Sequence, residues 1–158
     1  MEIDLAEYTV TIKWQRGEQD FLGDNYSRGH IWEFDGGIRV PASASPHVVP
    51  LPKSVAENVD PEEAFVASLS SCHMLFFLSI AAKNGYVVDN YEDCAVGHLE
   101  ENERGKFAMT KVILRPDIAF SGDKRPTAEE LEKIHVQSHE QCFIANSVIT
   151  KVSTEPVT

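Results

Sequence analysis

The sequence has few cysteines and few basic residues. Among its 158 residues only three are cysteine, and 14 Lys and Arg face 25 Asp and Glu, for a net charge of −11. Three cysteines cannot build the disulfide framework that holds small secreted proteins together. The acidic balance, with no basic stripe anywhere along the chain, argues against binding to nucleic acid or to an anionic membrane surface.

From the sequence we also expect neither a secretory leader nor a membrane span. Its first residues, MEIDLAEYTV, carry acidic side chains and begin a strand-like pattern, which is not typical of a targeting peptide. The longest apolar run, Ala64–Ala82, approaches the ~20 residues that cross a bilayer, but it contains four serines and a histidine. We therefore expect a core helix in a cytoplasmic protein, with no membrane partner.

Strands are predicted in the first part of the chain. Residues 8–15 alternate apolar and polar side chains, which indicates a half-buried strand. Residues 26–34 and 37–43 flank the turn sequence DGG, and this predicts a hairpin because glycine readily adopts positive φ. Four prolines between positions 41 and 52 then predict a loop.

A long helix is predicted next. Asp60 can cap it, Pro61 suits its first position, and Lys83 and Gly85 mark its end. Such a helix has about 24 residues, and its surface is apolar nearly all round. One small sheet covers only one side of a helix, so this composition favours cover from a partner subunit.

The last third of the chain predicts a second group of elements. Residues 91–121 look like two strands around the turn NERG, and Thr127 begins a capping box that opens a helix over residues 128–141. A short helix or turn at 142–150 and a terminal strand complete the chain. The order of strands, helix, strands, helix and strand predicts one α+β domain over residues 1–158.

Cys72 is the first candidate for chemistry, although a lone cysteine in a core helix is usually inert. Ser68, Ser70 and Ser71 precede it, and serines compete for backbone hydrogen bonds inside helices. If the helix breaks there, Cys72 lies in the first turn of the next segment, where the positive end of the helix dipole favours its thiolate. If the helix is unbroken, that stabilisation is absent.

Three other residues are candidates for the same site. Cys142 follows the second helix where the chain turns, so the two cysteines could meet in space. Arg28 and Glu62 could form a charge pair that reaches the thiol, because a guanidinium stabilises a thiolate and a carboxylate can hold the guanidinium. In the alternative interpretation neither residue acts on the thiol: Glu62 only interacts favourably with the helix dipole, and Arg28 is only a surface residue of a strand. Cys94 has no comparable context.

A metal site is a further alternative. His135 and His139 stand at positions i and i+4 of the second predicted helix, a spacing that zinc sites use. Cys142 follows three residues later, and Cys72 with His73 could complete the ligands. No C-x-x-C pair supports this reading, and histidines at this spacing also arise by chance on solvated helices.

Three segments together resemble one family. DPEEAFVASLSSCHMLFFLSIAAKNGY (60–86) is similar to the central helix of the OsmC/Ohr proteins, YSRGH followed by DGG to their N-terminal hairpin, and HEQCFIANSV to the segment with their second cysteine. The resemblance implies antiparallel sheets wrapped around a long central helix in an intertwined homodimer. It also implies a cofactor-free, thiol-dependent peroxidase that reduces organic hydroperoxides and is recycled by an external dithiol.

The resemblance implies a role for each candidate residue. Cys72 would be the thiol that attacks the peroxide, and Cys142 the thiol that forms a disulfide with it. Arg28 would activate Cys72, and Glu62 would position Arg28.

Two alternatives accompany these roles. Arg16 and Arg39 lie near enough in sequence to replace Arg28. The same fold could also serve as a non-enzymatic module that senses thiol oxidation or binds a small molecule.

Overall fold

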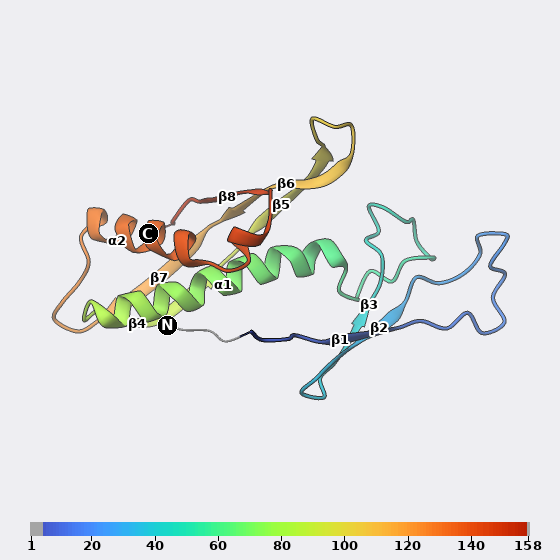
Figure 1. Ribbon diagram of the computed structural model, residues 1–158, viewed down its shortest axis with the longest axis horizontal. Coiled ribbons are helices and arrows are strands. Elements are labelled where there is room, and N and C mark those ends of the chain that lie inside the picture. Colours follow the sequence, from blue (N-terminus) through green and yellow to red (C-terminus); the bar gives the residue numbers. More distant parts are fainter. Residues whose placement is uncertain (1–4, 158) are drawn as a thin grey trace. The chain divides into compact units, whose positions relative to one another are not determined.

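The structure is a computed structural model that describes residues 5–157. The chain forms two compact units, Met1–Ala64 and Phe65–Thr158, and each is described by itself. The boundary falls inside the first turns of the long helix α1 (Pro61–Lys83). The α+β class predicted from the sequence is confirmed (Figure 1).

The first unit contains a three-stranded antiparallel sheet. Its strands β1 (Val10–Lys13), β2 (His30–Phe34) and β3 (Arg39–Ala42) follow one another in space as in sequence. The predicted hairpin at DGG is confirmed, and Gly37 supplies the positive φ of 95° that the turn needs.

The prediction that the first strand is half-buried is wrong within this chain. All four residues of β1 are exposed, including Val10 and Ile12. The strand lies at the edge of a single sheet, and the described part of this unit adds only loops and the start of α1 to that sheet. An exposed apolar edge strand of this kind is suited to cover by another chain.

Helix α1 begins and ends as its sequence predicts. Asp60 Oδ1 accepts a 2.8 Å hydrogen bond from the Glu63 backbone N–H, which is an N-cap contact. At the other end Gly85, with φ of 82°, takes the left-handed conformation that terminates helices.

The serines before Cys72 do not break the helix. Ser68 Oγ donates to the Phe65 carbonyl at 2.8 Å, and Ser70 Oγ donates to Asp93 Oδ2 at 2.5 Å, while the helical backbone continues through both. Of the two alternatives for Cys72, the structure therefore has the unbroken helix, and the thiol gains nothing from a helix N-terminus.

The apolar part of α1 forms the core of the second unit. This helix is long and apolar enough to cross a membrane, but its residues Phe77 and Ile80 are packed with Ile118 and with Ile134 of the helix α2 (Ala128–Gln141). Figure 1 shows α1 and α2 side by side. The cover is incomplete: 28% of the most apolar window is buried, and Leu75 is 60% exposed.

Residues 91–121 form parts of four strands, not the predicted two. The strands are β4 (Val87–Asp93), β5 (Val96–Glu101), β6 (Phe107–Leu114) and β7 (Pro116–Ser121). The turn NERG joins β5 to β6, as predicted. The strands on either side of this hairpin, β4 and β7, pair with each other in a separate two-stranded sheet. The chain therefore changes sheet between β4 and β5 and again between β6 and β7.

The C-terminal elements follow the prediction with one difference. The capping box between Thr127 and Glu130 opens α2, and a 3-10 turn, η1 (Ala145–Ser147), comes after it. The last strand, β8 (Lys151–Thr154), pairs with β6 in parallel, so the sheets are not purely antiparallel as expected. A parallel neighbour is reached because α2 and η1 form the long crossover that such pairing needs.

Candidate functional site

The second unit brings two of the predicted site residues together. Cys72 is half-buried in α1, and Cys142 is 1% exposed at the C-cap of α2. Both are free thiols, and their side chains interact with each other. The site is thus a thiol pair built from two helices.

Packing of the segment after α2 explains how the pair forms. Ile144, Ala145 and Val148 pack against the core that includes the buried Leu69 of α1. The backbone N–H of Ala145 also donates to Cys142 Sγ at 3.4 Å. The apolar side chains that follow Cys142 therefore fix its sulfur against α1.

An aromatic pair flanks the thiols. Phe76 lies one turn after Cys72, and Phe143 directly follows Cys142. Their rings meet edge to face with centroids 5.1 Å apart, a favoured geometry for aromatic contacts. This ring contact joins α1 to the segment after α2.

The electrostatics of the pair distinguish its two members. Burial, and then the hydrogen bond with the Cys72 side chain, raise the pKa of Cys142 to about 11, although backbone N–H groups of Ala145 and Ile144 act in the opposite direction. Cys142 therefore keeps its proton at neutral pH. A protonated Cys142 can donate to the Cys72 sulfur.

The structure places Arg28 and Glu62 in the first unit. The Arg28 guanidinium bonds Asp24 Oδ1 at 2.6 Å and the Tyr26 carbonyl at 2.8 Å, and lies 3.7 Å from the centre of the Tyr26 ring. Glu62 Oε2 is shielded from solvent and has no hydrogen-bond partner among residues 5–157. The predicted links between Arg28, Glu62 and Cys72 stay predictions.

The other arginine and cysteine candidates have local contacts. Arg39 forms an ion pair with Glu33 at 3.1 Å, and Arg16 donates to the Gln19 carbonyl at 3.0 Å. Cys94 is exposed between β4 and β5. None of these contacts involves the thiol pair.

Sequence reasoning missed a buried pair of imidazoles. His73 Nε2 lies 3.0 Å from His135 Nδ1, and the two rings stack with centroids 5.4 Å apart. The one signal for this was that His135 follows Ile134 and Leu131 on the apolar face of the predicted helix. Within the described residues no three His, Cys, Asp or Glu side chains gather closely enough to hold a metal ion, so the zinc alternative has no ligand set there.

The chain around this site matches a known family. The sequence profile described as "OsmC-like protein" matches residues 54–156. The chain belongs to the OsmC-like family. The resemblance found in the sequence is thereby confirmed, although no curated protein matches the chain.

Solved structures of OsmC-like proteins extend the match to nearly the whole chain. An OsmC-like protein of unknown function from Vibrio cholerae is 58% identical, with a TM-score of 0.95, and the match covers 97% of this chain and 100% of that one. An OsmC-like protein from Mycoplasma pneumoniae is 15% identical, with a TM-score of 0.71 and 96% of both chains covered.

One relative is an organic hydroperoxide resistance protein. OhrB of Bacillus subtilis is 18% identical, with a TM-score of 0.65, and the match covers 97% of this chain and 99% of that one. At this identity the likeness shows a shared fold alone. The OsmC-like fold of this chain is therefore established, and its activity must be argued from the site.

Proposed function

We propose that this OsmC-like protein is a thiol-dependent peroxidase that reduces organic hydroperoxides. The supporting observation is the interacting pair of free thiols, Cys72 of α1 and Cys142 at the C-cap of α2. Two such thiols can store the two electrons that a peroxide takes up. No further redox group is required for that exchange.

The Cys72 thiolate carries out the first step. It attacks the terminal oxygen of the hydroperoxide, a sulfur–oxygen bond forms, the oxygen–oxygen bond breaks, and the alkoxide leaves and takes up a proton to become an alcohol. Cys72 is thereby oxidised to a sulfenic acid. Cys72 is assigned this role because Cys142 is more deeply buried and keeps its proton.

Cys142 carries out the second step. Its sulfur bonds to the Cys72 sulfur, the sulfenic hydroxyl leaves, and that hydroxyl departs as water with the Cys142 proton. An external dithiol then reduces the disulfide by thiol exchange and is itself oxidised. The adjacent Phe76 and Phe143 rings suit an apolar peroxide substituent.

The roles of Arg28 and Glu62 are part of the same proposal. A guanidinium near Cys72 would stabilise its thiolate, and the unpaired Glu62 Oε2 is an acceptor that a guanidinium can satisfy. The proposal requires Arg28 to give up its ion pair with Asp24 and to contact Cys72 and Glu62 instead.

We further propose that the protein acts as a homodimer in the cytoplasm, with residues 1–158 as one domain. A second subunit would cover the apolar edge strand β1 and the exposed side of α1 around Leu75. Three free cysteines suit a reducing compartment.

Rapid-mixing kinetics test the proposed function. Reduced protein is mixed with tert-butyl hydroperoxide or with hydrogen peroxide, and consumption is followed with and without dithiothreitol. Cys72→Ser should abolish consumption, whereas Cys142→Ser should allow one oxidation per subunit and block turnover by the disulfide route. Cys94→Ser is the matched control and should behave as the wild type.

Two results would count against the peroxidase. Full activity in Cys72→Ser would exclude the mechanism. If the wild type is oxidised once but does not turn over when dithiothreitol is present, the result would favour the alternative, a non-enzymatic module that senses thiol oxidation.

A further inference from the structure

A cavity separate from the thiol pair opens between α2 and β8. It has a volume of about 550 Å³, within the range of small-molecule sites. Most of its wall is apolar and comes from Ala128, Leu131, Val136, Val152 and Pro156. Neither cysteine is among the residues that line it, so it is not the place where the proposed peroxide chemistry occurs.

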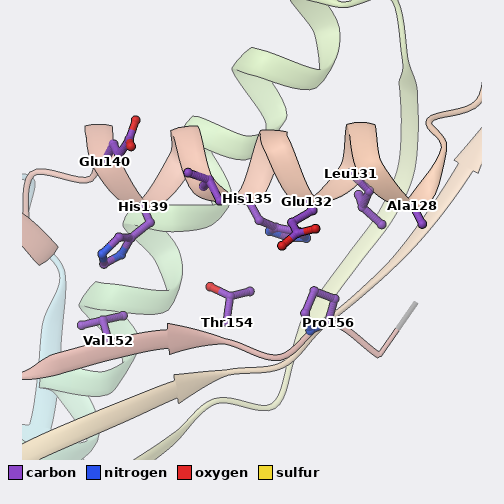
Figure 2. Close-up of a pocket in the computed structure, with 10 residues that line it drawn as sticks. Ala128, Leu131, Glu132, His135, His139, Glu140, Val152, Thr154 and Pro156 are labelled. Carbon is purple, nitrogen blue, oxygen red and sulfur yellow. The ribbon is translucent and has the colours of Figure 1, made fainter.

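One buried polar atom at this cavity has no partner. His135 is 4% exposed, and its Nδ1 is engaged by His73, but its Nε2 has no hydrogen bond among the described residues. Figure 2 shows the rings of His135 and His139 directed from α2 towards β8, where Thr154 forms the opposite wall. A buried ring nitrogen without a partner is unfavourable, and a bound molecule can satisfy it.

The imidazole contact defines the group that can bind. If His73 donates to His135 Nδ1, then His135 Nε2 carries a hydrogen and is a donor. In the opposite tautomer Nε2 accepts. A hydroxyl group serves either tautomer, because it both donates and accepts.

The charge around the cavity restricts the ligand further. Glu132 and Glu140 are among the lining residues, and the chain as a whole has a charge of −11. A carboxylate in the cavity would be repelled by both side chains and could not donate to Nε2. The apolar wall favours a hydrocarbon body over a second polar group.

We propose that the cavity between α2 and β8 binds a neutral apolar molecule with one hydroxyl group, which hydrogen-bonds Nε2 of His135. The hydrocarbon packs on the apolar wall, and the hydroxyl fixes its orientation. This site exists independently of the thiol pair and does not require the protein to be a peroxidase.

Titration with three probes of equal chain length tests the proposal. Protein with ¹⁵N-labelled histidine is titrated with 1-hexanol, hexanoate and hexylammonium while the ring ¹⁵N resonances are recorded. The expected result is a saturable shift of His135 Nε2 by 1-hexanol, with affinity at least tenfold higher than for hexanoate. Hexylammonium binding as tightly as 1-hexanol would overturn the choice of a neutral ligand.

Variants separate the hydrogen bond from the fold. His135→Asn keeps a polar atom near Nδ1 for His73 but removes Nε2, and should weaken 1-hexanol binding about fivefold. Thr154→Phe fills the cavity from a strand position that accepts aromatics and should abolish binding. Cys72→Ser should bind as the wild type, and circular dichroism confirms that each variant is folded.

Three outcomes would overturn the proposal. The first is no ring shift with 1-hexanol in the folded wild type. The second is unchanged affinity in both His135→Asn and Thr154→Phe. The third is a joint shift of His135 and His139 on addition of Zn²⁺ alone, which would assign the cavity to a metal.

Discussion

Acid should destabilise the protein through its two buried imidazoles. His73 is 1% exposed, and the two rings hydrogen-bond each other over 3.0 Å. Burial lowers the pKa of His73 to about 4, with help from His135 and His139 and against the opposing effect of Asp93. Burial alone lowers the pKa of His135 to about 4. The fold therefore accommodates both rings in their neutral form.

The sign and size of the effect follow from proton linkage. In the unfolded chain each imidazole titrates near its ordinary pKa of 6.5, so below that pH the unfolded state binds more protons than the folded state. The free energy of unfolding falls as the pH falls from 6.5, and the loss is complete below pH 4. Between pH 7 and pH 5 it amounts to about 2 kcal/mol per imidazole, or about 4 kcal/mol for the pair.

Unfolding in guanidinium chloride at pH 7 and at pH 5 measures this loss, at fixed ionic strength and protein concentration. A His73→Phe/His135→Phe double variant keeps two stacked rings but cannot titrate. Its free energy of unfolding should change about 4 kcal/mol less than that of the wild type between the two pH values. His47→Gln removes an exposed histidine and should leave the wild-type difference intact. Equal losses in the double variant and the wild type would refute the reasoning.

Two further predictions concern the long helix. Asp60→Ala removes the N-cap of α1 and should lower the free energy of unfolding by about 1 kcal/mol, measured by chemical unfolding at pH 7. An Asp60→Asn variant that lost as much would argue against the cap. Leu75→Glu places a charge on the exposed side of α1 and should raise the dissociation constant of the proposed dimer at least tenfold in sedimentation experiments. Arg104→Glu, on a solvated turn, should not change it.

The features that could be predicted from the sequence are those encoded locally. The cap at Asp60, the end of α1 near Gly85, the DGG hairpin and the capping box at Thr127 each depend on residues within a few positions of one another. Local backbone preferences are sufficient for such features. The same local logic predicted Ala128–Gln141 as α2.

The features that were missed depend on long-range pairing. The division of residues 87–121 into four strands follows from β4 pairing with β7 across the β5–β6 hairpin, and hydrophobic alternation carries no information on which strand is the partner. The parallel pairing of β6 with β8 has the same origin. The buried contact between His73 and His135 likewise joins two helices and leaves no spacing signal in either.

The candidate site divides in the same way. Sequence patterns identified Cys72 and Cys142 but left open whether they meet, because their contact depends on how the segment after α2 packs on α1.

The unbroken α1 also removes the helix dipole as a source of thiolate stabilisation for Cys72. In the proposed mechanism the buried Cys142 retains a proton that it can donate to the Cys72 sulfur. A guanidinium would have to come from the first unit. Once Cys72 is a sulfenic acid, closing the disulfide needs only Cys142, whereas rapid attack on a peroxide needs the charged sulfur. A protein that reacts slowly with hydroperoxides but forms the disulfide quickly from the sulfenic acid would therefore have the thiol pair without the proposed contribution of Arg28.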